Sequence, residues 1–161
     1  MRLILKAVAV VLVFVSCDSN GVYDQYTSIN NSWAMEDTIA FSFDKPSSSE
    51  THDLFVNIRN DNRYPFSNLF LVVEMNFPNG KAIVDTLEYD MAKPNGEWLG
   101  KGFTDIKESK LWYKEGVVFP EEGKYEVNIS HLMRKNGQEQ GVKDLPGITD
   151  VGFRIEQSAS Q

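Results

Sequence analysis

LFLVVEMNFPNGKAIVDTLEY, residues 69–89, is the stretch that decides the fold. Its first part, residues 69–77, is apolar almost without interruption, which indicates a strand buried near the centre of a sheet. The turn FPNGK follows, and Asn79-Gly80 can supply the positive φ angles of a tight hairpin turn. A second strand-like run covers residues 82–89. The stretch therefore predicts a β-hairpin.

The pattern of a half-buried strand recurs on both sides of this hairpin. Apolar residues occupy every second position in residues 39–43, 54–58, 125–129 and 151–155. No window of twelve or more residues after residue 16 shows the 3.6-residue apolar period of a helix. The sequence therefore predicts an all-β fold, an antiparallel β-sandwich of roughly seven to nine strands.

The chain begins with MRLILKAVAVVLVFVS, residues 1–16, in which Arg2 and Lys6 stand at the front of an apolar run. This layout is typical of a cleaved secretory signal peptide. As a helix, the run from Leu3 to Val15 would cover only about 20 Å, well short of the roughly 30 Å hydrocarbon core of a bilayer. We therefore expect residues 1–16 to be removed rather than to span a membrane.

The only cysteine of the chain, Cys17, follows directly in FVSCDSN, residues 14–20. The pattern resembles the processing box of bacterial lipoproteins, in which the cysteine is acylated and becomes the new N-terminus, although Phe14 stands where the usual box has leucine. The alternative is an ordinary signal peptide with Cys17 incidental. We expect lipidation, because the lone cysteine occupies the one position where a lipoprotein needs it. Several acyl chains would anchor the protein stably to a membrane.

Without residues 1–16 the chain is long enough for one domain with one hydrophobic core. It carries 23 acidic and 14 basic side chains, a formal charge of −9, which makes nucleic acid a poor partner. The composition predicts a lipidated N-terminus and polar spacer at residues 17–35. A β-sandwich domain at residues 36–156 and a polar tail at residues 157–161 are expected to follow.

Motifs for catalysis or metal binding are absent from the sequence. It has no Gly-x-Ser-x-Gly, no phosphate-binding glycine loop and no His-Glu-x-x-His. Neither His52 nor His131 has a cysteine or a second histidine at ligand spacing. We therefore expect no enzymatic activity, no metal and no cofactor. A hydrolase, which would need two facing carboxylates, is a weaker alternative.

The segment NIRNDNRYPFSNLF, residues 57–70, gathers polar side chains around a Tyr-Pro pair. Its candidate contact residues are Arg59, Asn60, Arg63 and Tyr64, which would form a recognition loop. The alternative is a turn in which Asn and Asp side chains satisfy local backbone groups and the proline holds Tyr64 extended. The sequence favours the turn and leaves the recognition loop open.

A second segment, residues 97–125, contains the candidate contact residues Trp98, Trp112 and Tyr113 beside lysines and acids. Exposed aromatic residues with a polar rim are how a sandwich surface binds sugar or protein. The alternative is that they are core residues, as aromatic side chains in a domain of this size usually are. These residues motivate a second functional hypothesis, a glycan-binding β-sandwich lipoprotein.

Long stretches of the chain resemble a known family. They are SCDSN, VYDQY, LFVNIRNDNRYPFSNLFLVVEMNFPNGKAIVDTLEYDMA, GEWLGKGFTDIKESKLWYKEGVVFPEEGKYEVNISHLMRKNG and LPGITDVGFRIE. Together they are similar to the gliding-motility lipoprotein GldH family of the Bacteroidota, from the signal to about Glu156. In that family the lipidated cysteine corresponds to Cys17, and no catalytic residues are established.

The resemblance implies a membrane-anchored lipoprotein of the cell envelope that is an accessory or structural component of the gliding machinery. It also implies partners among the gliding or type IX secretion proteins of the envelope. Asp18-Ser19-Asn20 lacks the acidic cluster that resembles a surface-export signal of this phylum. We therefore expect the domain to face the periplasm.

Overall fold

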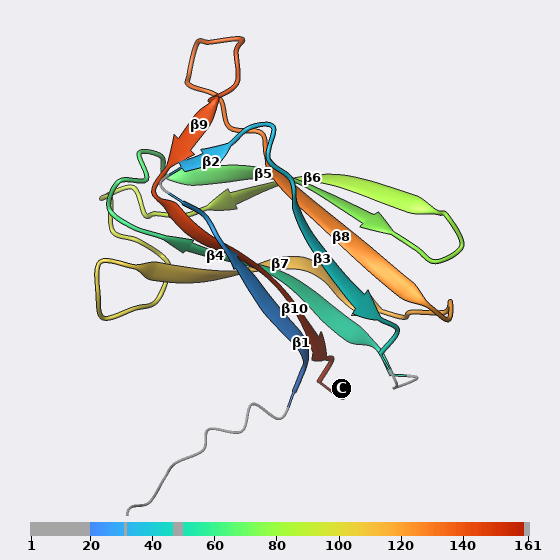
Figure 1. Ribbon diagram of the computed structural model, residues 1–161. Helices are drawn as coiled ribbons and strands as arrows, with labels where there is room; N and C mark the ends of the chain where they lie inside the picture. Colours follow the sequence, from blue (N-terminus) through green and yellow to red (C-terminus); the bar gives the residue numbers. More distant parts are fainter. Residues whose placement is uncertain (1–19, 31, 47–49, 160–161) are drawn as a thin grey trace, which may run out of the picture.

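The computed structural model describes residues 20–30, 32–46 and 50–159 (Figure 1). Within these ranges the chain forms ten strands and no helix, so no helix there could cross a membrane. The strands are β1 (Gly21–Ser28), β2 (Ser32–Ala34), β3 (Ile39–Asp44), β4 (His52–Asn60), β5 (Asn68–Asn76), β6 (Ala82–Asp90), β7 (Lys107–Val117), β8 (Lys124–His131), β9 (Asp144–Pro146) and β10 (Ile148–Gln157).

Eight of these strands form two antiparallel sheets packed face to face. Sheet I has the order β1-β10-β4-β7, and sheet II has the order β3-β8-β5-β6. In Figure 1, sheet I is the lower-left layer and sheet II the upper-right layer. The remaining strands, β2 and β9, pair with each other at the upper end of the molecule in this view. The predicted antiparallel β-sandwich is confirmed.

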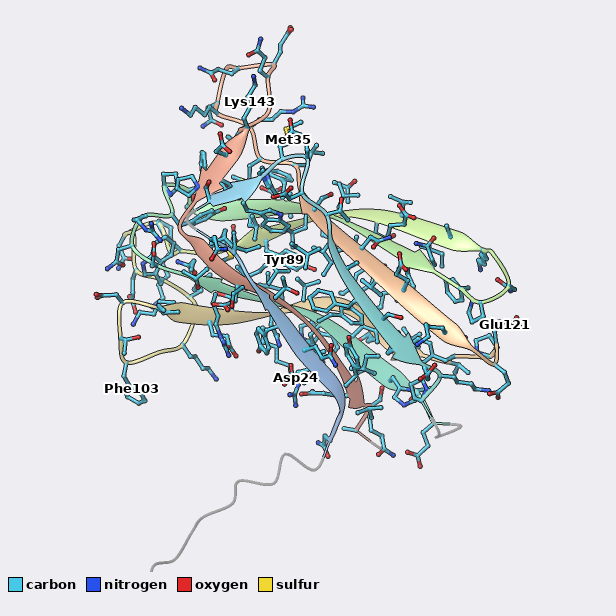
Figure 2. The ribbon with its side chains drawn as sticks, in the orientation of Figure 1. Asp24, Met35, Tyr89, Phe103, Glu121 and Lys143 are labelled. Carbon is cyan, nitrogen blue, oxygen red and sulfur yellow. The ribbon has the colours of Figure 1, made fainter. Side chains whose placement is uncertain are left out.

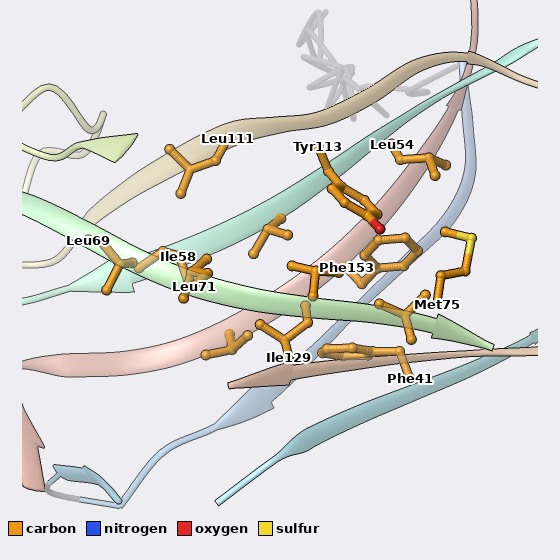
Figure 3. Close-up of a cluster of buried hydrophobic side chains, with 14 of the residues drawn as sticks. Phe41, Leu54, Ile58, Leu69, Leu71, Met75, Leu111, Tyr113, Ile129 and Phe153 are labelled. Atoms are coloured by element: carbon orange, nitrogen blue, oxygen red, sulfur yellow. The ribbon is translucent and has the colours of Figure 1, made fainter. Parts of the chain in front are cut away.

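The core lies between the two sheets, where the apolar positions of the alternating strands meet (Figure 3). Strands of sheet I and sheet II contribute Phe41, Leu54, Ile58, Leu69, Leu71, Met75, Leu111, Tyr113, Ile129 and Phe153. Each of these side chains is at most 8% exposed. Burial of this much apolar surface is the main force that holds the two layers together.

The hairpin predicted from residues 69–89 is formed by β5 and β6. Its register runs from Leu69 opposite Tyr89 to Asn76 opposite Ala82. Gly80 has a φ of 85°, the left-handed conformation that the turn requires and that glycine adopts without strain. β5 lies between β8 and β6 inside sheet II, as its continuous apolar run predicts.

The predicted spacer at residues 17–35 is wrong from residue 21 onward, because β1 and β2 lie within it. β1 pairs with β10 along its length and forms one edge of sheet I. Its Tyr23 ring packs against Phe43 and Phe153, at centroid distances of 5.3 and 6.3 Å. The folded domain therefore already includes Gly21, well before the predicted start at residue 36.

The C-terminal boundary also extends slightly further than the sequence predicts. β10 includes Gln157, and the backbone N–H of Ser158 donates to the carbonyl of Thr51 over 2.9 Å. Residues 157 and 158 therefore belong to the folded domain. The predicted signal peptide and Cys17 lie outside the described residues.

Candidate functional site

The outer face of sheet I carries aromatic and charged side chains in register across its four strands. Read from β1 to β7, the rows are Asp24-Arg154-Phe55-Trp112, Tyr26-Gly152-Asn57-Lys110 and Ser28-Asp150-Arg59-Glu108. Residues two apart on a strand share a face, so these twelve positions form one continuous surface. We call this surface the platform.

An aromatic cluster occupies the β7 side of the platform. Phe55 points away from the core, yet it is only 4% exposed. The Trp112 ring covers it at a centroid distance of 4.6 Å, and the Lys110 ammonium lies 4.0 Å from its ring centroid. Trp112 itself stays 54% exposed. The cluster is therefore a small second apolar layer with Trp112 as its exposed cover.

An ion-pair network runs along the β10 side of the platform and includes the neighbouring Glu156. Arg154 donates to Glu156 over 2.6 Å and to Asp24 over 2.5 Å. Lys110 donates to the same Glu156 oxygen over 2.6 Å. Partial burial favours the neutral carboxyl, but hydrogen bonds from Lys110 and Arg154 outweigh it and hold the pKa of Glu156 below its usual range. Glu156 therefore binds two cations as a carboxylate.

A second network surrounds Tyr26. Asn57 donates to the Tyr26 hydroxyl over 2.9 Å, and that hydroxyl donates to Glu108 over 3.3 Å. Arg59 lies 4.2 Å above the Tyr26 ring and donates to Glu108 over 2.5 Å. Burial, with the added effect of the Glu108 charge, raises the pKa of Tyr26 to about 12. A Cβ on Gly152 would lie 2.7 Å from the Tyr26 ring, so the ring requires a glycine beneath it.

A shallow hollow of about 280 Å³ separates the two networks. Its lining residues are Asp24, Tyr26, Asn57, Glu108, Lys110, Arg154 and Glu156. The acids Asp24, Glu108 and Glu156 each face a cation or a hydroxyl donor. Glu156 is held ionised by its two cations, and a carboxylate held in this way is a weak general base.

The loop of residues 99–106 extends the platform at the start of β7. Lys101 and Glu108 exchange two backbone hydrogen bonds of 2.8 Å, and the Lys107 ammonium donates to the Gly102 carbonyl over 2.6 Å. Phe103 at the tip is fully exposed, and Ile106 is also exposed. A hollow of about 680 Å³ lies between this loop and residues 108–111 of β7.

The predicted contact residues are divided between different parts of the structure. Arg59 and Trp112 lie on the platform. Tyr113, which follows Trp112, points into the sandwich and is 8% exposed. Its hydroxyl donates to Asp85 of β6 over 2.9 Å, which links the edges of the two sheets. Tyr113 is therefore a core residue, as the alternative interpretation of the second segment predicts.

The two predicted segments meet where Tyr64 and Trp98 come together, with ring centroids 6.2 Å apart. Tyr64 is 3% exposed, and its hydroxyl donates to the Asn68 carbonyl over 2.6 Å. The Trp98 indole donates to Asn62 over 3.2 Å. Both aromatic side chains are therefore engaged within the protein.

The remaining two candidates make local contacts. Asn60 is 1% exposed, with its side-chain amide 3.4 Å from the carbonyl of Asp61. Arg63 is exposed and pairs with Asp61, two residues earlier, over 2.7 Å. These local hydrogen bonds are what the turn interpretation of residues 57–70 predicts.

Several platform residues were missed by sequence reasoning, namely Asp24, Tyr26, Phe55, Lys110 and Arg154. The spacing of Phe55, Asn57 and Arg59 places them on one face of β4, and this signal was available. For Tyr26 no such signal exists, because the polar composition of residues 17–35 predicts a spacer and not a strand. Among the described residues, no group of three or more His, Cys, Asp and Glu side chains is arranged to hold a metal ion.

Comparison with known proteins identifies relatives along the folded domain. Residues 21–155 match the family model described as GldH lipoprotein. A protein of Christiangramia forsetii named gliding motility lipoprotein GldH homolog is 59% identical over 148 residues, which cover 92% of this chain and 91% of that protein. The gliding motility lipoprotein GldH of Flavobacterium johnsoniae is 51% identical over 149 residues, covering 92% of each chain.

Two solved structures show weak likenesses to this chain. Dimeric latent PorU from Porphyromonas gingivalis matches with a TM-score of 0.38 at 12% identity, covering 86% of this chain and 13% of that one. The VP2 subviral particle of infectious bursal disease virus matches with a TM-score of 0.39 at 12% identity, covering 88% of this chain and 34% of that one. Nothing about function follows from matches at this level. The family match and the two close relatives agree with the resemblance seen in the sequence, and the chain belongs to the GldH lipoprotein family.

Proposed function

We propose that the protein is a lipid-anchored component of the gliding-motility machinery in the cell envelope, and that it acts through protein-protein contacts rather than catalysis. The observation that carries this proposal is the identity of 59% and 51% to proteins named for gliding motility, over 92% of the chain. At such identity the whole folded domain, not a single motif, is shared. Cys17 supplies the anchor.

The described site supports a non-catalytic role. The acids of the platform are held by cations or hydroxyl donors, and the hollow between them is shallow. An accessory component held at a membrane gains occupancy from its tether, because the anchor raises its effective concentration near envelope partners. Even a weak protein interface then suffices.

The anchor is tested by the Cys17→Ala variant, with the wild-type protein as control. Wild-type protein should stay with the membrane fraction through high-salt and carbonate washes, and its mass should include the acyl groups. The variant should lose both properties. A Cys17→Ala protein that stayed membrane-bound through both washes would disprove the anchor.

The motility role is tested by deletion of the gene and complementation. The deletion strain should fail to glide over a surface, the wild-type gene should restore gliding, and the Cys17→Ala gene should restore it poorly. Crosslinking in intact cells, followed by mass spectrometry, should identify gliding or type IX secretion proteins of the envelope as partners. Normal gliding of the deletion strain would overturn the proposal.

A periplasm-facing domain is part of the same proposal, supported by the absence of an acidic cluster after Cys17. Added protease should leave the domain intact in whole cells and cleave it once the outer membrane is permeabilised. Cleavage in whole cells at the rate of a known surface protein would place the domain outside instead.

The exposed Trp112 ring is the one observation that favours the alternative of glycan binding. The other two aromatic candidates give it less support, because Tyr113 is buried and Trp98 is hydrogen-bonded to Asn62. Titration of tryptophan fluorescence with polysaccharides separates the two functions. A saturable shift that is lost in Trp112→Phe would favour glycan binding, and no shift would favour protein partners.

A further inference from the structure

A residue that is bound to the folded domain lies very close to the proposed anchor in sequence. The backbone N–H of Gln157 donates to the carbonyl of Asn20 over 2.9 Å, so the chain is bound to the domain at Asn20, three residues after Cys17. Three residues span at most about 11 Å even when fully extended. A domain tethered this closely must rest against the bilayer, so one part of its surface faces lipid.

The exposed aromatic residues are found on the sheet I side of the molecule. Among the described residues, the exposed large hydrophobic side chains include only two aromatic ones, Trp112 on the platform and Phe103 on the loop of residues 99–106. Figure 2 shows Phe103 on the lower side of the molecule, the side where Asp24 of β1 also lies. In Figure 1, β1 begins on that side too. The aromatic residues and the start of the fold therefore share one side.

Phe103 is held outward by a braced loop. Gly102 has a φ of 156°, and a Cβ there would lie 2.4 Å from the Ile106 carbonyl oxygen, so the loop closes tightly around a glycine. The Lys107 ammonium fixes the Gly102 carbonyl. A phenylalanine left in water instead of being buried forgoes the favourable removal of its ring from water. A loop that is braced by these contacts and presents such a side chain is suited to insertion into an apolar environment.

The charges beside these aromatic residues suit a lipid headgroup layer. Lys101 and Lys107 lie close to Phe103 in sequence, with Asp105 between them, and Lys110 lies near Trp112 on the platform. The platform acids are paired with cations or, for Asp150, with hydroxyl donors. Tryptophan and basic residues are the side chains that proteins place at membrane interfaces. The outer face of sheet II differs, since the outward residues of its four strands include several acids and a single basic residue, Lys124.

We propose that the platform and the loop of residues 99–106 face the membrane that holds the anchor, with Phe103 and Trp112 entering the lipid headgroup region. This orientation rests on the proposed lipidation of Cys17. It leaves the outer face of sheet II directed away from the bilayer and free for protein partners. The tether and the aromatic residues provide the attachment, because the nearly balanced charge of the platform gives little electrostatic attraction.

The test uses the mature lipidated protein in vesicles of phosphatidylethanolamine and phosphatidylglycerol. Acylation blocks Cys17, so an engineered cysteine is the only free thiol of the chain. An environment-sensitive dye is attached to Phe103→Cys on the loop or, as matched control, to Val84→Cys on the exposed outer face of sheet II. Quenching by spin-labelled lipids should be several-fold stronger at position 103 than at position 84, with a blue-shifted emission only at 103.

Equal quenching at the two positions, stronger quenching at position 84, or no quenching at either would overturn the proposed orientation. Flotation of the same samples distinguishes this failure from failure of the anchor. Protein that floats with the vesicles but shows no contrast between the two dyes is anchored and wrongly oriented. Protein that does not float, and whose mass lacks acyl groups, contradicts the lipidation itself. Circular dichroism of both labelled variants confirms that the sandwich is intact.

Discussion

The two sheets present very different outer faces, although the same two-residue alternation builds both. On sheet I, Trp112 and Lys110 lie over Phe55, and Tyr26 bonds to Asn57, so Phe55 and Asn57 are at most 4% exposed. On sheet II the outward residues are mostly short side chains and acids, with Phe70 and Lys124 as exceptions, and the largest apolar one of β6, Val84, is 61% exposed. Alternation thus determines which way a side chain points, while the length of its neighbours determines whether it is buried.

The largest effect should come from Phe55→Ala, with Val84→Ala as the matched control. Phe55 is buried under Trp112 and Lys110, so its truncation should cost about 3 kcal/mol of unfolding free energy, close to the value for a core phenylalanine. Val84→Ala should change the unfolding free energy by less than about 0.5 kcal/mol, as exposed substitutions do. Urea unfolding measures both. Similar costs for the two variants would mean that sheet I has no covered layer.

The architecture of the fold could be predicted from the sequence because it depends on alternation and turns. The β5-β6 hairpin and the core positions of β4, β8 and β10 follow from apolar residues at every second place. β1 could not be recognised in the same way. It is an edge strand with apolar side chains only at Val22, Tyr23 and Tyr26, and its stability comes from pairing with β10, more than 120 residues later in the chain.

The platform could be predicted only in part, for a related reason. The face shared by Phe55, Asn57 and Arg59 is visible in the sequence of one strand. The partners Glu108, Lys110 and Arg154 come from other strands and depend on a register that no local pattern specifies. The candidates chosen for local composition, Asn60, Arg63 and Tyr64, instead make contacts within their own turn.

The second-largest loss of unfolding free energy is expected for a substitution at Gly152, because the outer face of sheet I is tightly packed at this glycine. Gly152→Ala would place a Cβ 2.7 Å from the Tyr26 ring and 3.1 Å from the Gln25 carbonyl oxygen. The overpacking should cost about 1–3 kcal/mol of unfolding free energy. In the Tyr26→Ala background the same change should cost clearly less, because the ring is gone. Additive effects of the two substitutions would show that the ring does not press on Gly152.

Removal of an ion pair should change the unfolding free energy less than the two substitutions above, and more on sheet I than on sheet II. Arg154→Met removes the cation shared by Asp24 and Glu156, and it should cost about 1 kcal/mol at low salt, as partly exposed networks do. Added salt should reduce this cost by screening. The control on sheet II is Glu126→Gln, which keeps an acceptor for Asn128 and should be nearly neutral. An equal cost for both variants, independent of salt, would show that Arg154 acts through packing alone.

Acidification should cause the smallest loss of unfolding free energy. The contribution of His131 in sheet II should be lost at a higher pH than that of Glu156 in sheet I. His131 of β8 lies 3.1 Å from the Trp33 carbonyl through Nε2, and its Nδ1 accepts the Met133 N–H over 3.4 Å. A protonated imidazole has a donor on both nitrogens, so it cannot accept from Met133. Burial lowers the pKa of His131 against the weaker opposing effect of the Trp33 carbonyl. The folded protein therefore binds this proton less readily than the unfolded chain does.

The direction in which pH changes stability follows from the difference between the folded and the unfolded pKa. The unfolded histidine titrates near 6.5, so the contribution of His131 is complete above that pH and declines as the pH falls from there towards the lower folded pKa. For Glu156 the folded pKa is also lowered, so stability from the platform is kept above about 4.5 and is lost only at more acidic pH. Urea unfolding across this range should show a loss below about pH 6.5 that is smaller in His131→Gln. Loss at more acidic pH should be smaller in Glu156→Gln, because this variant removes a carboxyl whose folded pKa is lowered. If the loss of unfolding free energy below about pH 6.5 were unchanged in His131→Gln, a group other than His131 would cause it.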